Sequence, residues 1–474
     1  MFDKPYIKKA LLTCVVLCLF AFLLSILPEI WFSHHLKKNW NVQENANTGK
    51  KNGRRYRLCL VFALDGVPYR MVRDLQKQGY FGGFYPPGRL VSTFPSLTRP
   101  AFSKMLIGGK PFGYERLYYN FDINQMEGKT LVNKAFSTQK EHADYHPKLH
   151  FLGFPGYIAY VFPDKFTQTA LDAFKTRLKH FKGDEFIAYM GISDAIAHVE
   201  GEDALVEFLK KVSELLDTVR NDIGILLDVV LFSDHANNFT ANRRVDLSTP
   251  LAEAGFRNVN ELEGSKDYVL PENGLVSFAA IYSANQNSPV IAGVLSMIEG
   301  VDFCLYRSGI SLLVQGAKGT ARISKQQNRF LYSRFDGDPL VLEDTILRLK
   351  HLGKVDSHGF VHEKDWWMAT KDHIYPDPLR RLWEGMNDLV QHPATMLVSL
   401  KDGYAFGPPI FDQPIIHSRA GTHGALLASN SYGFLMTDFM PVDNASRPAD
   451  VASLLERAAE AKKTGKKLLG LDAN

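Results

Sequence analysis

The chain has 474 residues, of which 45% are hydrophobic and 22% are charged. This is an ordinary globular composition, and the length allows one large domain or roughly two to three smaller ones with ample core. The formal net charge of +4 is small against 55 basic and 51 acidic residues, and no dense basic stretch is interleaved with aromatic residues, so nucleic-acid binding is not expected. Four cysteines do not make a disulfide framework and do not decide between an oxidising and a reducing compartment.

Residues 10–28 form an apolar stretch, ALLTCVVLCLFAFLLSILP, that contains no charged residue. The stretch is long enough to cross a bilayer, exceeds most signal-peptide apolar cores, and is followed by no small-x-small cleavage site. Trp31 and Phe32 suit an interfacial position. We therefore predict a cytoplasmic tail and transmembrane signal anchor in residues 1–32, followed by a polar linker in residues 33–56.

The charges that flank this stretch bear on its orientation. Lys4, Lys8 and Lys9 precede it, and more basic residues follow it, namely Lys37, Lys38, Lys50, Lys51, Arg54 and Arg55. Basic residues accumulate on the cytoplasmic side of membrane proteins. Charge counting alone therefore places the body of the protein in the cytoplasm, so an outward orientation needs another argument.

Beyond residue 56, apolar runs of strand length alternate with helical patterns. The expected strands are 57–65, 89–94, 185–194 and 227–235, and the expected helices are 67–79, 99–109, 167–182 and 204–222. This alternation favours a mostly parallel central sheet flanked by helices on both faces, so we predict an α/β fold. From about residue 275 to 350, shorter β-like runs replace the pattern, and no fixed-period repeat occurs. The last stretch, 449–470, is a helix whose basic end is a solvated face.

Three of the expected strands end in the same way. One ends at Asp65, one at Asp194 with His198 four residues later, and one at Asp234, which His235 follows directly. In an open parallel sheet, ligands bind beyond the carboxyl ends of the strands. The purely structural alternative is that each aspartate caps the following helix, and for any single aspartate this alternative stays open. Three carboxylates with two histidines at one edge instead indicate a constellation of ligands.

This set of residue types suits Zn²⁺, or Mn²⁺ where more ligands are oxygen. Two divalent ions carry a charge of about +4, and three carboxylates reduce it to about +1, which attracts a phosphate or sulfate ester. Two-metal sites of this kind hold both the attacking and the leaving oxygen of an in-line displacement. A nucleophile and one further metal ligand are still missing from the set.

The nucleophile candidate lies in residues 92–109, STFPSLTRPAFSKMLIGG. Thr98 precedes Arg99 and Pro100, so we predict that Thr98 is the N-cap of the helix that follows. The same position lies over the positive end of that helix, which stabilises a developing alkoxide or a phosphate oxygen. Capping and catalysis therefore predict the same place. For the missing ligand, His423 in RAGTHGALL is a candidate, although a lone histidine is more often a surface or core residue.

The ordered set of these residues resembles the alkaline phosphatase superfamily, and in particular its type I phosphodiesterase/nucleotide pyrophosphatase branch. LDGVPYR, which starts at residue 64, resembles the opening LDG motif of the branch. PSLTRPAFSKMLIG is similar to its P-T-x-T-x-P nucleophile segment, with Gly108 ten residues after Thr98. That spacing favours Thr98 over Thr93, whose TFP resembles the same motif. The resemblance spans roughly residues 57–440.

The resemblance implies two zinc ions, with Mn²⁺ as an alternative. One ion would be held by Asp194, His198 and His423. The other would be held by Asp65, Asp234 and His235, with Thr98 reaching toward it as nucleophile and ligand. It also implies an alkaline phosphatase-like catalytic domain over 57–440, an inserted α+β subdomain at about 275–370, and a C-terminal helical tail over 441–474.

This sequence departs from the branch at two positions. The histidine commonly found four residues after the nucleophile is Phe102 here. The asparagine that helps to hold the phosphate has an approximate counterpart in Asn120, displaced by one residue, and Arg99 beside the nucleophile is a further candidate phosphate contact. These departures bear on the nucleotide substrate more than on the chemistry.

The expected function is a membrane-anchored two-zinc phosphohydrolase, most simply a phosphodiesterase that acts through a covalent phospho-threonine. Three alternatives stay open: a phosphoethanolamine-type transferase of the same superfamily, a phosphomonoesterase on the same scaffold, and a non-catalytic glycan- or lipid-binding domain. The partner would be a phosphate-ester small molecule or a lipid headgroup, and the sequence gives no oligomeric state. The resemblance favours a catalytic domain outside the cytoplasm, against the charge count.

Overall fold

The computed structural model divides the chain into two units, Met1–Tyr56 and Arg57–Asn474. It describes residues 50–51, 54–55, 57–128, 145–153, 160, 163–222, 226–272, 274–408 and 420–464. In the first unit, strand β1 (Lys50–Lys51) pairs antiparallel with β2 (Arg54–Arg55). The predicted anchor at 10–28 and most of the predicted linker lie outside the described residues. Within the described ranges, no helix has the length and apolarity to cross a membrane.

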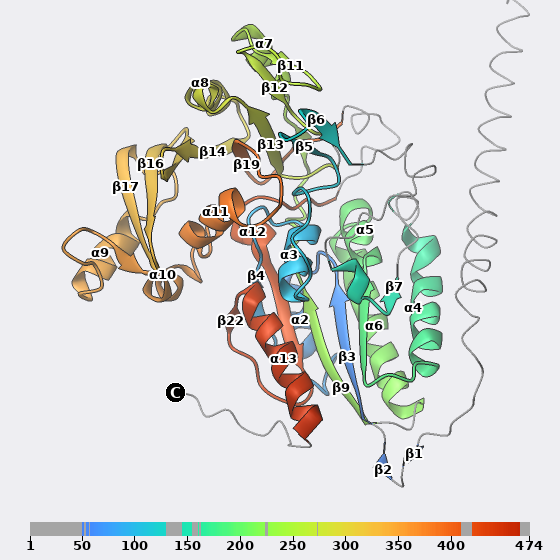
Figure 1. The fold of residues 1–474 in the computed structure, drawn as a ribbon. Coiled ribbons are helices and arrows are strands. Elements are labelled where there is room, and N and C mark those ends of the chain that lie inside the picture. The colour runs from blue at the N-terminus through green and yellow to red at the C-terminus, as the bar shows by residue number, and fades with distance from the viewer. Residues whose placement is uncertain are drawn as a thin grey trace, which may run out of the picture. The chain divides into compact units, whose positions relative to one another are not determined.

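The second unit is built on a seven-stranded sheet with the order β22-β4-β21-β9-β3-β8-β7 (Figure 1). In that order the strands are Ala445–Ser446, Gly88–Val91, Tyr432–Thr437, Leu226–Ser233, Arg57–Leu64, Glu185–Met190 and Phe151–Leu152. β9, β3, β8 and β7 are parallel neighbours. β21 is antiparallel to both β9 and β4, so β4 runs in the same direction as β9. The prediction of a mostly parallel α/β sheet is confirmed.

Helices cover both faces of this sheet, and the side chains of β3 are therefore buried on both faces. Cys59, Val61 and Ala63 point to a core that they share with α3 (Thr98–Met105) and α13 (Pro448–Thr464). On the other face, the ring of Phe62 stacks on Phe174 of α4 with ring centroids 4.6 Å apart. The helices of that side are α2 (Tyr69–Lys77), α4 (Pro163–Lys179), α5 (Ile192–Val199) and α6 (Glu202–Asp222).

A second sheet of nine strands has the order β11-β12-β13-β19-β14-β15-β16-β17-β18. In that order the strands are Arg257–Asn258, Asp267–Val269, Phe278–Ser283, Met396–Leu400, Val301–Ser308, Ser311–Gly316, Gly319–Gln326, Arg329–Gly337 and Val361–His362. All pairs but β11 with β12 are antiparallel. The sheet takes strands from residue 257 to residue 400, a longer stretch than the predicted subdomain at 275–370.

Shorter elements complete the described chain. The remaining helices are α7 (Ser248–Glu253), α8 (Ser288–Leu295), α9 (Glu343–His351), α10 (Glu363–Thr370), α11 (Pro378–Asn387) and α12 (Ala428–Ser431), with 3₁₀ turns at His146–Lys148 and Asn285–Asn287. β5 (Tyr118–Asn120) pairs with β6 (Gln125–Glu127), and β10 (Arg243–Arg244) pairs with β20 (Tyr404–Ala405). α11 packs toward the nucleophile segment, because Phe94 and Leu97 share a core cluster with Leu382 of α11 and with residues of the second sheet.

Candidate metal centre and active site

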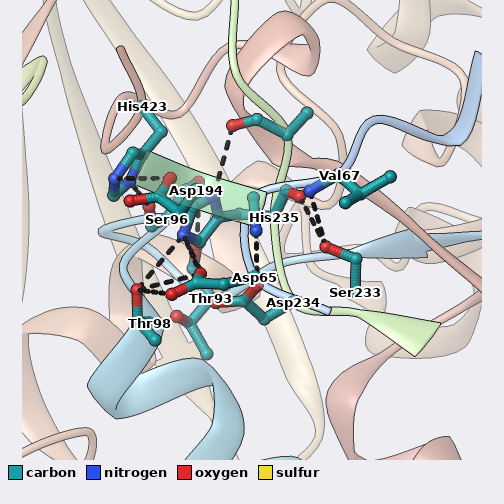
Figure 2. A network of polar contacts seen from close by, with 12 residues as sticks. Asp65, Val67, Thr93, Ser96, Thr98, Asp194, Ser233, Asp234, His235 and His423 are labelled. Carbon is teal, nitrogen blue, oxygen red and sulfur yellow. Dashed lines mark hydrogen bonds and ion pairs between the residues drawn. The ribbon is translucent and has the colours of Figure 1, made fainter. Parts of the chain in front are cut away.

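The topology of the seven-stranded sheet brings the candidate residues to one edge. β9, β3 and β8 are adjacent and parallel, so the segments with Asp234, Asp65 and Asp194 leave the sheet at the same side. β4 runs in the same direction and leads into the segment of Thr98. β21 runs in the opposite direction, so the segment before it, which carries His423, enters at this edge. Figure 2 shows these side chains pointing toward one another.

Three side chains converge around the Nε2 atom of His235. This atom lies 3.3 Å from Oδ1 of Asp65, 3.3 Å from Oδ2 of Asp234 and 3.4 Å from Oγ1 of Thr98. Oγ1 of Thr98 lies 3.2 Å from Oδ1 of Asp65. Asp65, Asp234 and His235 are buried, and Oδ2 of Asp234 has no hydrogen-bond partner among the described residues.

These spacings fit a bound metal ion. A tetrahedral zinc site with bonds of about 2.0–2.1 Å has ligand atoms about 3.3–3.4 Å from one another. The measured separations of 3.2–3.4 Å match that edge length. The unpartnered oxygen of Asp234 is also explained, because a metal ligand needs no hydrogen-bond donor. Asp65, Asp234, His235 and Thr98 therefore form a donor set of the kind that zinc takes.

The second predicted ligand set is arranged differently from the expectation. Nε2 of His423 lies 3.8 Å from Oδ1 of Asp194, and Nε2 of His198 lies 3.4 Å from Oδ2 of Asp194. Two groups in the described chain have possible ligand atoms that all lie within 4.8 Å of one another. One group is Asp194, His235 and His423, and the other is Asp65, Asp234 and His235. His198 follows Asp194 by one turn of α5, contacts its other oxygen and is in neither group. Its role as a ligand stays a prediction.

Backbone carbonyls set the tautomers of two histidines. Nδ1 of His423 lies 2.9 Å from the carbonyl oxygen of Ser96, and Nδ1 of His235 lies 3.3 Å from that of Ala236. A carbonyl oxygen can only accept, so in both rings Nδ1 carries the hydrogen. When the rings are neutral, the lone pair of Nε2 is therefore available in both, on the side where the carboxylates lie. Metal-ligating histidines are oriented in the same way, by a hydrogen bond from the other ring nitrogen.

Burial and charge perturb the pKa values of the cluster strongly. Burial raises the pKa of Asp234 well above its usual range, and burial with the charge of Asp194 raises that of Asp65. Burial opposes protonation of His235, but Asp234 and Asp65 outweigh it and raise the pKa of His235 to about 9. Burial and the charge of His235, whose ring stacks 3.9 Å away, lower the pKa of His423 well below its usual range. Without metal, the pKa of about 9 favours a proton on His235 at neutral pH.

Metal binding should be coupled to the release of this proton. A metal ion needs the deprotonated ligands and must displace the proton of His235. Its affinity should therefore rise with pH from 6.5 to about 9 and level off above the pKa of His235. The expected slope is up to about tenfold per pH unit for each proton released. Zinc affinity measured by chelator competition over this range, with calorimetry in buffers of different ionisation enthalpy, checks it. A flat affinity over this range with no proton release would contradict the assignment.

Thr98 is not the helix cap that the sequence predicts. α3 begins at Thr98, and Leu97 holds the N-cap position without a side-chain cap. The hydroxyl of Thr98 instead points to Asp65 and His235 (Figure 2). The N-cap position and the candidate nucleophile are thus neighbouring residues, Leu97 and Thr98. It is the first helical residue, Thr98, whose side chain points toward the sheet edge. The hydroxyl of Thr93 donates to the carbonyl of Pro95 at 2.8 Å, within its own segment.

Gly66 of the LDG motif allows its backbone to lie close to the side chains of Asp194 and Asn237. It has a φ of +67°, and a Cβ atom there would lie 2.5 Å from Oδ1 of Asp194 and 2.6 Å from Nδ2 of Asn237. Its N–H donates to Oδ1 of Asp234 at 3.3 Å. Glycine is needed here both for the backbone conformation and for the space beside the ligand.

Three further polar residues that the sequence did not single out hold the carboxylates. Tyr189 of β8 donates to Oδ2 of Asp65. Tyr160 donates to Oδ2 of Asp194 at 2.7 Å, and Nδ2 of Asn237 donates to Oδ1 of Asp194 at 3.1 Å. These bonds orient the carboxylates as supporting residues do in metal sites. A tyrosine within an otherwise apolar buried strand was the available signal for Tyr189, and the two-residue spacing from His235 was the signal for Asn237.

The two predicted substrate contacts lie outside this cluster of carboxylates and imidazoles. Asn120 is the last residue of β5, and its amide donates to Glu127 of β6 at 2.8 Å. Arg99 is the second residue of α3, half-buried beside Thr98. Phe102 packs its ring on Tyr189 with centroids 5.3 Å apart. An aromatic core thus lies beneath this side of the site.

Comparison with known proteins finds similarity in structure. No family model matches the chain, and no curated protein matches it in sequence. Similar solved structures include human ectonucleotide pyrophosphatase/phosphodiesterase 5, at 10% identity and a TM-score of 0.46, over 88% of this chain and 97% of that chain. The murine protein, as an inactive variant in complex with AMP, gives 11% identity, a TM-score of 0.46 and the same coverage. Phosphonoacetate hydrolase from Sinorhizobium meliloti 1021, in complex with phosphonoformate, gives 13% identity and a TM-score of 0.47, over 88% of this chain and 100% of that chain.

Proposed function

We propose that this chain is a metal-dependent phosphoric ester hydrolase of the alkaline phosphatase type, and more specifically a phosphodiesterase with Thr98 as its nucleophile. The observation that carries the proposal is a set of four buried or half-buried ligand atoms that includes Nε2 of His235. Nε2 lies 3.3–3.4 Å from the other three atoms, and Oγ1 of Thr98 lies 3.2 Å from Oδ1 of Asp65, as expected in a tetrahedral zinc site. One of the four atoms is thus the hydroxyl oxygen of Thr98. A hydroxyl at a metal-ligand position is an activated nucleophile.

Asp65, Asp234 and His235 would hold one zinc ion, and Asp194, His423 and His198 would hold the other, with Mn²⁺ as an alternative. When bound, the two ions supply a Lewis acid for the phosphoryl oxygens and lower the pKa of hydroxyl ligands. Thr98 Oγ1 attacks phosphorus and gives up its proton. The new O–P bond forms as the bond to the leaving group breaks, and the leaving oxygen takes up a proton to depart as an alcohol. Water then attacks the phospho-threonine, which returns the Thr98 hydroxyl and releases the second product. Asp65 keeps the hydroxyl oriented through its hydrogen bond from Thr98.

The charge of the site supports a diester substrate. Two divalent ions with the carboxylates of Asp65, Asp194 and Asp234 leave a charge of about +1. This complements the single negative charge of a phosphodiester better than the two charges of a monoester. Arg99 and Asn120 remain proposed phosphate contacts. The substrate would be a small-molecule phosphate ester or a lipid headgroup.

The anchor at residues 10–28 and an extracytoplasmic catalytic unit belong to the same proposal. The length and apolarity of that stretch support the anchor. A reporter fused after Asn474 distinguishes the two orientations. Activity of a reporter that works only in the cytoplasm would contradict the proposed orientation but not the proposed chemistry.

The direct test is turnover by the purified full chain in mild detergent. Chromogenic diester and monoester substrates are compared after chelation and after zinc is restored. The proposal expects diester hydrolysis that depends on zinc and exceeds monoester hydrolysis. A larger monoester rate would favour the phosphomonoesterase. Transfer of the headgroup to an added alcohol, without release of the free product, would favour the transferase. Tight metal binding without turnover of either ester would favour a non-catalytic binding domain.

A further inference from the structure

Arg381 is a buried arginine that joins three segments of the chain. It lies in α11 and is 4% exposed. Its Nη1 donates to the carbonyls of Pro376 at 2.9 Å and Leu426 at 3.1 Å. Its Nη2 donates to the carbonyl of Thr93 at 2.9 Å, to Oγ of Ser96 at 3.1 Å and to Oγ of Ser431 at 2.7 Å. One guanidinium thus connects α11 with the nucleophile segment and with the segment after His423.

No carboxylate of the described chain shares a hydrogen bond with this guanidinium. The neighbouring acid, Asp377, instead accepts from Nε of Arg447 at 2.7 Å and from its Nη2 at 3.0 Å. A buried cation without a paired anion is costly, because protein carbonyls and hydroxyls replace water only in part. Such a group is retained where its several donors fix segments that must not move relative to one another.

Ser96 is the residue through which Arg381 reaches both halves of the site. It lies two residues before Thr98, and its carbonyl oxygen accepts from Nδ1 of His423 at 2.9 Å. Its N–H donates to the carbonyl of Gly424 at 3.1 Å. A shift of Ser96 would therefore move the nucleophile and release the hydrogen bond that sets the tautomer of His423.

We propose that Arg381 is a positioning residue that locks the Thr93–Ser96 segment onto the His423 segment. It touches neither the substrate nor the cluster atoms. By holding Ser96 it fixes Nε2 of His423 toward Asp194 and fixes the start of α3 with Thr98. Its catalytic consequence rests on the proposed function, whereas its effect on the His423 ring does not.

The test follows the imidazole nitrogens of His423 in the metal-free full chain by NMR with ¹⁵N-labelled histidine. A spectrum of His423→Gln identifies the signal of His423. In Arg381→Gln, the Nδ1–H signal of His423 should lose its protection from exchange, and the two nitrogens should move toward the values of a tautomer mixture. Arg381→Lys keeps the charge but not the fork of donors and should show a smaller change in the same direction. Ser431→Ala removes one acceptor and serves if Arg381→Gln does not fold.

The matched control is Arg380→Gln, one residue earlier on the same helix. Arg380 contacts Glu363 and Glu384 rather than Ser96, so its loss should leave the His423 signal unchanged. In the active enzyme, Arg381→Gln should lower kcat by about 100-fold, the scale of a displacement of about 1 Å, with KM changed less than about threefold. An unchanged His423 signal in Arg381→Gln, or in both milder variants, would overturn the inference. If the signal changes but the wild-type chain hydrolyses no ester, the proposed function fails and the positioning role stands.

Discussion

Replacing Thr98 by alanine should abolish most turnover while the fold and the metal content stay nearly unchanged. The side chain of Thr98 caps no helix, so its loss should reduce the free energy of unfolding only slightly. Among the described residues, its hydroxyl contacts the side chains of Asp65 and His235. Loss of the covalent route should raise the activation free energy by about 4 kcal/mol, or roughly 1000-fold in rate. Steady-state kinetics with zinc analysis and thermal unfolding measure all three quantities.

Two variants make this result discriminating. Thr98→Ser keeps the hydroxyl and should keep part of the activity. Thr93→Ala removes a hydroxyl that donates within its own segment, to Pro95, and should stay active. An inactive Thr93→Ala beside an active Thr98→Ala would show that the nucleophile segment is aligned wrongly. Full activity in both would exclude displacement through a threonine.

Replacing His235 by alanine should remove about one of two zinc ions per chain and nearly all activity. Nε2 of His235 is the atom shared by the contacts to Asp65, Asp234 and Thr98. Without it, two buried carboxylates face each other with no imidazole between them, and the metal loses a ligand. The loss of activity should exceed about 1000-fold, because an unfilled site removes charge stabilisation and nucleophile activation together.

Elemental analysis of the purified chain gives the zinc count before and after the change. Asp234→Asn is the companion variant, since it keeps the shape of the side chain while it weakens the ligand. His392→Ala is the control, because His392 stacks on Tyr118 away from the cluster and should leave zinc unchanged. A wild-type chain that carries no transition metal and is nevertheless fully active would refute the metal centre.

The sequence could predict the site residues that directly follow an apolar strand along the chain. β3 and β9 are apolar strands that Asp65 and Asp234 follow directly, and parallel neighbouring strands deliver such residues to one edge. Asp194 was expected at the end of a strand, but β8 ends at Met190 and Asp194 lies in the first turn of α5. The chemistry of the set is unaffected, since a short turn spans the difference.

The supporting residues could not be predicted because their partners are distant in sequence. Tyr189 meets Asp65 because β8 pairs with β3 in a particular register, which no spacing within either strand reveals. Arg381 meets Ser96 across 285 positions of the chain. Its sequence context, beside Arg380 in an amphipathic helix, is that of a solvated charge. Tertiary packing alone decides which of these two neighbouring arginines is buried.

The contact of α11 with the nucleophile segment limits how this protein could be rebuilt. Phe94 and Leu97 share a core cluster with Leu382 and with residues of the nine-stranded sheet, such as Phe303. The long stretch between His235 and His423 is therefore not an exchangeable module that a designer could excise or swap for a shorter loop. The hairpin of β16 and β17 lies toward the far end of that sheet, so it is the place where length variation, affinity tags or new binding loops should be tolerated.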